Sequence, residues 1–91
     1  MPNPATTNCT AGVWTLIATD QIFGYLYSKK RGPAKYLYTY RLTGEAAPTS
    51  SDEGVPIFIS DEKKFIISGL GIDIYVMAVG SDGAVRYDWW W

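Results

Sequence analysis

Hydrophobic and polar residues alternate along much of the chain with a period of two, which is the spacing of side chains on an extended strand. One such segment is Ile72–Val79, whose two sides are both largely apolar. Asp82-Gly83 then supplies a tight reversal, because glycine readily adopts the positive φ of a two-residue turn, and Ala84–Tyr87 follows as a return strand. The pattern predicts a β-hairpin near the end of the sequence.

Five further segments show the strand pattern: Val13–Ala18, Ile22–Tyr27, Lys35–Leu42, Val55–Ile59 and Lys64–Ser68. Pro56 places its strand at a sheet edge or at a strand start, because proline cannot donate a hydrogen bond to a neighbouring strand. No apolar spacing of the helical type runs for more than two turns. About seven short strands at regular intervals predict an all-β fold, a small antiparallel β-sandwich or jelly-roll-like barrel.

The predicted organisation has three parts within one domain. Residues 1–12 contain two prolines, three threonines and two asparagines, and they predict an extended N-terminal arm, which either frays or lies on a neighbouring subunit. Residues 13–88 form the β-sandwich domain, and residues 89–91 are an aromatic C-terminal tail. Residues 43–54 are small, polar and acidic, which is typical of a surface loop. A chain of 91 residues has a small core, and association with other subunits would add to its stability.

Charge and hydropathy exclude two classes of partner. The chain has 8 basic and 9 acidic residues and a net charge of −1, so it offers no electrostatic attraction for nucleic acid or an anionic membrane. The basic cluster Lys29–Arg31 lies in a predicted turn, where its cations either keep a sheet edge solvated or contact phosphate or an acidic partner. We find no signal-peptide pattern and no apolar run of about 20 residues, and we expect synthesis in the cytoplasm.

The residue types argue against catalysis. Histidine is absent and Cys9 is the single cysteine, so the sequence has neither a Cys–His nucleophile pair nor the ligands of structural zinc. Most acids lie in predicted turns. Asp73 is an exception inside an apolar strand, and we expect it to face outward or to pair with Arg41 or Arg86. We predict a non-enzymatic protein with no catalytic residues, no metal and no cofactor.

Aromatic residues are the main candidates for binding. Trp89, Trp90 and Trp91 end the sequence, and tryptophan is enriched at interface hot spots. They either fold back to cap their own sandwich or insert into a neighbouring subunit; successive strand residues point to opposite faces, so one small domain does not easily hide all three. We predict the three tryptophans as partner-binding anchors, with Tyr87 beside them.

Three tyrosines share one face of the predicted strand Lys35–Leu42. Tyr36, Tyr38 and Tyr40 have two interpretations. Their rings either close the core and leave the hydroxyls in water, or form an exposed ladder on which sugars or a protein partner stack. The ladder is the basis of an alternative function in glycan or receptor binding.

Several segments together resemble small virion proteins of tailed bacteriophages, of the type that decorates capsids or tails. The resemblance is carried by Val13–Thr19, Tyr40–Leu42, Ala46–Pro48, Glu53-Gly54, Ile74–Val79 and Ala84-Val85, with a glycine-rich hairpin before the last of these segments. The resemblance covers about residues 13–88, and it implies a β-sandwich that oligomerises on a particle surface. The Lys29–Arg31 turn and the three-tryptophan tail depart from this pattern.

The resemblance and the residue chemistry lead to two hypotheses. The first is a virion structural protein, a capsid decoration or cement protein or a minor tail component, which binds other virion proteins and copies of itself through apolar sheet faces and termini. The second is a carbohydrate-binding or receptor-binding β-sandwich module that stacks glycans on tyrosine or tryptophan rings.

Overall fold

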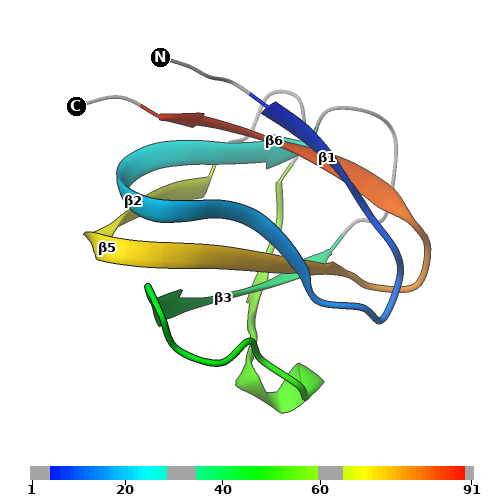
Figure 1. Ribbon diagram of the computed structural model, residues 1–91. Helices are drawn as coiled ribbons and strands as arrows, with labels where there is room; N and C mark the ends of the chain where they lie inside the picture. Colours follow the sequence, from blue (N-terminus) through cyan, green and yellow to red (C-terminus); the bar gives the residue numbers. More distant parts are fainter. Residues whose placement is uncertain (1–4, 29–34, 60–64, 90–91) are drawn as a thin grey trace.

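The computed structural model describes residues 5–28, 35–59 and 65–89, which form an all-strand structure with one short turn of 3₁₀ helix (Figure 1). The strands are β1 (Ala5–Cys9), β2 (Thr15–Ser28), β3 (Tyr36–Leu42), β4 (Val55–Ile57), β5 (Phe65–Ala78) and β6 (Gly83–Trp89). The 3₁₀ turn, η1 (Ser51–Glu53), directly precedes β4. Among the described residues, no helix is long and apolar enough to cross a membrane.

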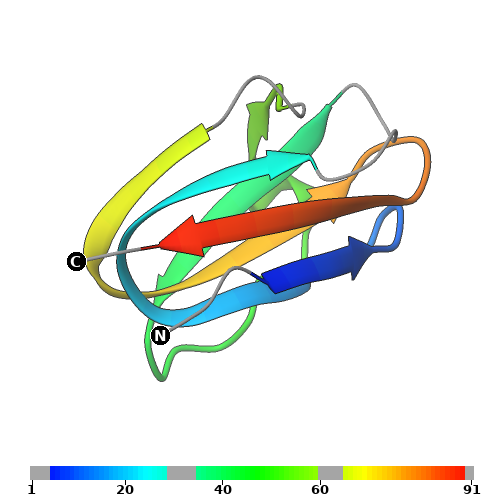
Figure 2. The same ribbon diagram turned by 90° about the horizontal axis from the view of Figure 1, so that it is seen from above.

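The strands form one antiparallel ladder in the order β1-β6-β2-β5-β3-β4, folded into two layers. β2 and β5 are long strands that turn back at one end of the molecule, so each contributes to both layers (Figures 1 and 2). The first layer contains β1, β6, residues 23–28 of β2 and residues 65–68 of β5. The second contains residues 15–21 of β2, residues 72–78 of β5, β3 and β4. This arrangement confirms the predicted small antiparallel β-sandwich.

The bend of β2 lies between the two predicted strands Val13–Ala18 and Ile22–Tyr27. The register between β2 and β5 shifts repeatedly between Leu16 and Phe23, and Asp20 has a φ of 55°. Such shifts are β-bulges, which bend a strand and increase its twist without ending it. Residues 69–71 of β5 belong to the same long strand, with Gly71 at a φ of 65°. Two pairs of predicted short strands are therefore two long bent ones.

Hydrogen bonds to Asp73 stabilise this bend. Its Oδ1 atom accepts hydrogen bonds from the Thr19 hydroxyl at 2.6 Å, from the Asp20 backbone N–H at 3.0 Å and from the Thr43 hydroxyl at 3.0 Å. These hydrogen bonds to the charged form, the one from Thr19 first, lower the pKa of Asp73. Asp73 is on the outer side of its strand but buried. The predicted cation partners Arg41 and Arg86 instead form ion pairs with other carboxylates, described below.

The core lies between the two layers. The first layer contributes Leu26, Ile67, Val85 and Tyr87. The second layer contributes Tyr36, Tyr38, Ile57, Ile72, Ile74 and Val76. These positions alternate along their strands with residues that point away from the core, as the period of two requires.

The predicted hairpin at Asp82-Gly83 is wrong. β5 ends at Ala78 in the second layer, and residues 79–82 carry the chain to β6 in the first layer, where β6 pairs with β1 and β2. The second half of β5 is a central strand with β2 and β3 on its two sides, so it has no edge left for β6. Asp82 accepts a hydrogen bond from the Ala11 N–H at 2.9 Å instead.

The predicted N-terminal arm contains a strand. Ala5–Cys9 forms β1, which is extended but pairs with β6 of the same chain over its full length (Figure 2). The Cys9 side chain at the end of β1 is buried in the core. The sheet therefore begins at Ala5, eight residues before the predicted start of the sandwich at residue 13.

Candidate binding face

The outer side of the second layer is covered. Tyr75 and Met77 point away from the core, because they alternate with the inward Ile74 and Val76, and yet they are only 8% and 7% exposed. The cover comes from the segment that joins β3 to β4, residues 43–54, and from Trp14 before β2. The chain itself therefore covers Tyr75 and Met77, whereas Leu16, opposite Tyr75 on the same side of the layer, stays 47% exposed.

Trp14 packs between this segment and β3. Its indole N–H donates to the Ser50 carbonyl oxygen at 3.1 Å. A Cβ atom at Gly54 would lie 2.8 Å from Cη2 of Trp14 and 2.9 Å from Cβ of Leu37, so only glycine allows this close approach. The tryptophan thus holds the loop against the sheet.

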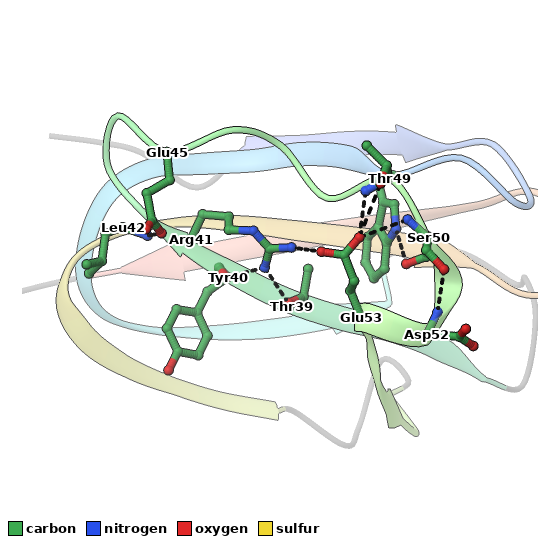
Figure 3. Close-up of polar contacts among 10 residues, drawn as sticks. Thr39, Tyr40, Arg41, Leu42, Glu45, Thr49, Ser50, Asp52 and Glu53 are labelled. Carbon is green, nitrogen blue, oxygen red and sulfur yellow. Dashed lines mark hydrogen bonds and ion pairs between the residues drawn. The ribbon is translucent and has the colours of Figure 1, made fainter.

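An ion pair holds the same loop from the side of β3 (Figure 3). The Arg41 guanidinium pairs with the Glu53 carboxylate, and it also donates to the Tyr40 carbonyl oxygen at 2.9 Å and to the Thr39 hydroxyl at 3.2 Å. At the end of the strand, the Glu45 carboxylate accepts from the Leu42 backbone N–H at 2.9 Å. Arg41 and Glu45 therefore bind the backbone carbonyl of Tyr40 and the backbone N–H of Leu42 along β3.

The second oxygen of the Glu53 carboxylate organises the loop backbone. It accepts hydrogen bonds from the N–H groups of Thr49 at 2.9 Å and Ser50 at 3.0 Å. These two bonds, supported by the charge of Arg41, lower the pKa of Glu53. The Arg41–Glu53 cluster has a structural explanation, because every contact in it fixes the cover on the second layer.

The outer side of the first layer has no such cover in the described chain. The register places Tyr25 opposite Asp88 on one side and opposite Ile66 on the other, and it places Tyr27 opposite Arg86. Ile66 is 60% exposed, and the four other side chains are partly exposed. We call these five residues, Tyr25, Tyr27, Ile66, Arg86 and Asp88, the open face.

Polar contacts fix one half of the open face. The Tyr27 hydroxyl donates to Oδ2 of Asp88 at 2.7 Å, and Nε of Arg86 donates to Oδ1 of the same carboxylate at 3.1 Å. Burial and the hydrogen bond to Asp88 raise the pKa of the Tyr27 hydroxyl. The result is a surface on which aromatic, cationic and anionic groups in fixed contact lie beside an apolar one, which suits binding by packing and hydrogen bonding.

Tyr87, predicted as a partner-binding residue, lies in the core instead. It is 2% exposed, and its ring lies over Gly24, where a Cβ atom would be 2.5 Å from the tyrosine Cζ. Its hydroxyl has no hydrogen-bond partner among the described residues, and burial raises its pKa to about 12. The absence of a side chain at Gly24 provides the room for this ring, so Tyr87 is not available to a partner.

The other predicted aromatic sites have different outcomes. The backbone of Trp89 pairs with Gly24 at the end of β6, and Trp90 and Trp91 lie outside the described residues. Tyr36 and Tyr38 are buried, whereas Tyr40, further along the same strand face, is 53% exposed. Because only one of the three rings is accessible, the structure does not contain the proposed three-tyrosine ladder.

The open face was not predicted as a site. Its signal in the sequence is the alternation in Ile22–Tyr27, which sets Tyr25 and Tyr27 opposite Gly24 and Leu26. That pattern predicts two tyrosines on one side of a strand. The alternation does not predict which face of β2 is covered, because the strands beside β2 are β5 and β6, and both are distant in sequence.

No protein-family model matches the chain, and neither the curated proteins nor the solved structures contain a match to it. Within the described residues, no group of three or more Cys, Asp or Glu side chains is placed to hold a metal ion. The structure therefore defines a fold class, a small β-sandwich, and the comparisons assign no family.

Proposed function

We propose that this protein is a non-enzymatic virion structural protein of a tailed bacteriophage, a capsid decoration or cement protein or a minor tail component. The observation that carries the proposal is the open face, where Ile66 is exposed and its four neighbours are partly exposed, whereas Tyr75 and Met77 on the outer side of the second layer are buried. The face lies on β6, the strand that leads into Trp89–Trp91. The resemblance of residues 13–88 to decoration proteins supplies the virion context.

The arrangement suits contacts between subunits better than a transient encounter with a charged molecule. Ile66 and Tyr25 provide apolar area opposite one another, and the Arg86–Asp88 pair presents both signs of charge. An interface core of aromatic and aliphatic groups with a polar rim is the common anatomy of protein contacts. The near-zero net charge also allows many copies to lie side by side with little mutual repulsion.

Mass spectrometry of purified virions tests the identity directly. The proposal expects peptides of this chain in particles purified through a density gradient, at a constant number of copies per particle. If the chain is found only in the cell lysate and never in the particles, the proposal is wrong.

A binding assay tests the role of the open face. Particles that lack the protein are mixed with purified chain and sedimented, using the native sequence, the double variant Tyr25→Ser/Tyr27→Ser and the control Tyr40→Ser. The native chain and the control are expected to sediment with particles, and the double variant is expected to lose most binding. Equal binding by all three would show that another surface makes the contact.

A second candidate, a glycan-binding module, is favoured by the same tyrosines. Tyr27 lies beside a carboxylate and a guanidinium, and sugar sites combine aromatic rings with charged hydrogen-bonding groups of this kind. Titration with a panel of glycans, followed by intrinsic fluorescence, tests this candidate. A glycan binder would show a saturable change that Tyr27→Ala removes and Tyr40→Ala keeps, whereas a subunit of an assembly would show none.

A further inference from the structure

The edges of the folded sheet are not equally protected. An unpaired strand edge presents free N–H and C=O groups to any extended chain, and native proteins block such edges with charged side chains, prolines or bulges. Residues 65–68 of β5 pair with β2 on one side, and among the described strands none lies on their other side, because β3 pairs with β5 only from residue 72 onward.

Three other edges carry blocking features. On β3, Arg41 and Glu45 occupy the carbonyl of Tyr40 and the N–H of Leu42. The β4 edge contains Pro56, which lacks a backbone donor. The first half of β2 shifts register repeatedly and is bent, so it offers no regular edge to a flat neighbour.

The β5 edge carries none of these features. Phe65–Ser68 contains no charge and no proline, and it pairs with Phe23–Leu26 in an unbroken register. Ile66, in the middle of this edge, is 60% exposed and points to the open face. Exposed large apolar side chains on a regular edge are the combination that promotes pairing with another chain.

The β1 edge is the nearest competitor. Ala5–Cys9 is also uncharged and free of proline, and it pairs with β6 on one side. It contains no large aliphatic or aromatic residue, and Cys9 is already buried. Pairing there would gain backbone hydrogen bonds but would bury no large exposed side chain, which makes it the weaker candidate.

We propose that a second copy of this chain binds at the β5 edge, with the two β5 strands antiparallel about a two-fold axis at Ile66. This inference rests on the proposed function, in that it names the first contact through which the subunits assemble. The two first layers, of four strands each, then join into one continuous sheet. A two-fold contact uses the same surface on both copies, which a single unblocked edge provides.

The alternation of side chains selects the register. An axis perpendicular to the sheet keeps both open faces on one side, so residues of the same parity must lie opposite each other. With the axis at Ile66, the two Ile66 side chains are direct cross-strand partners, and Phe65 faces Ile67 of the second copy. Directly opposite residues have Cβ atoms about 4.5–5.5 Å apart, which allows apolar contact.

The neighbouring residues are compatible with this pairing. Tyr25 lies opposite Ile66 on β2, so each isoleucine would lie between a tyrosine of its own copy and the isoleucine of the other. Only the residue on the axis, Ile66, faces its own copy, so no like charges meet there, and none of the residues 65–68 is charged. Tyr27, Arg86 and Asp88, on the side of the open face away from this edge, stay accessible to further partners in both copies.

Light scattering and sedimentation of three proteins test the proposal. The native chain is expected to have twice the mass of one chain at about 100 µM and to dissociate on dilution. Ile66→Lys is expected to be monomeric at the same concentration, because two like charges would be opposed. Leu16→Lys, at a similarly exposed position (47%) on β2, is expected to stay dimeric.

Cysteine cross-linking provides a second readout that does not depend on a new charge. Ile66→Cys is expected to form a covalent dimer under mild oxidation far faster than Leu16→Cys, because the two thiols meet at the axis. The native Cys9 gives little background, since it is buried and burial raises the pKa of its thiol to about 11.

The outcomes separate this inference from the proposed function. A native chain that is monomeric throughout, or equal cross-linking at positions 66 and 16, overturns the β5 pairing. A dimer that survives Ile66→Lys also overturns it and points to the β1 edge or another surface. In each case, particle binding by the native chain would leave the proposed function standing, and its loss would reject that function separately.

Discussion

The two layers of the sandwich differ in what lies on their outer sides. On the second layer, Trp14 and the loop of residues 43–54 cover the strands, and Arg41 and Glu53 fasten that cover. On the first layer, Tyr25, Tyr27 and Ile66 lie at the surface. Both outer sides carry aromatic and aliphatic residues, so composition alone does not distinguish them.

The difference teaches how a chain of 91 residues separates stability from binding. A covered outer side adds a second, small apolar cluster to a domain whose core is limited by its size. An accessible side with the same residue types leaves apolar area for another molecule. Substitutions on the two sides should therefore have different consequences, and four predictions test this in order of decreasing effect.

The largest effect is expected at Gly24, beneath the open face. In Gly24→Ala the new methyl group would lie 2.5 Å from the Tyr87 ring and 2.6 Å from the backbone oxygen of Asp88, so strand β6 must move. Overpacking of this kind costs about 3 kcal/mol. Urea unfolding measures the loss, with Gly54→Ala as the matched control. Since the control collides first with the Trp14 ring edge, it should cost less, and the reverse order would contradict the described packing.

Trp14→Ala tests the cover on the second layer. Loss of a half-buried indole and of its hydrogen bond to Ser50 is expected to lower the free energy of unfolding by about 2 kcal/mol. The variant should also bind a hydrophobic dye, because Tyr75 and Met77 become accessible. A variant as stable as the native protein would show that the loop covers this side without the tryptophan.

Asp73→Asn tests the bend that allows two layers to exist. The pKa of Asp73 is lower in the folded protein than its ordinary value of 3.8, so folding favours the ionised form. That stabilisation is present above pH 3.8 and is lost as the pH falls through the folded-state pKa. Melting temperatures should therefore be lower for the variant at pH 7, and the gap should narrow below about pH 4. A gap that is constant with pH would contradict this account.

The smallest effect is expected on the open face. Tyr27→Phe removes the hydrogen bond to Asp88, but water can replace it there, and the loss should be about 0.5 kcal/mol. The measurement is the same urea unfolding as for Gly24. A loss above about 2 kcal/mol would mean that the face contributes to folding as much as the cover does, and the comparison between the layers would fail.

Local patterns predicted the strands but not their pairing. The alternation around Ile74 and Leu26 and the edge position of Pro56 are recovered in the structure. The pattern ends one predicted strand at Ala18 and begins the next at Ile22, because bulges and turns both use polar residues that tolerate positive φ. The partner of β2 along most of its length is β5, far away in sequence, and no local pattern contains that information.

The candidate site was less predictable for the same reason. Tyr36, Tyr38 and Tyr40 share one strand face, and only the extent of the opposite layer makes the first two core and the third accessible. Tyr87 alternates with Arg86 and Asp88 along β6, and the absence of a side chain at Gly24 leaves room for its ring in the core. Exposure depends on which elements lie above a residue, and this follows from topology rather than from the residue itself.

The central claim is that the open face contacts neighbouring molecules and that the exposed end of β3 at Tyr40 does not. Hydroxyl-radical footprinting measures the oxidation rate of each tyrosine in the dilute chain and in the assembled state. The account predicts that oxidation of Tyr25 and Tyr27 slows severalfold on assembly, while the rate at Tyr40 stays unchanged. Slower oxidation at Tyr40 with unchanged rates at Tyr25 and Tyr27 would contradict it.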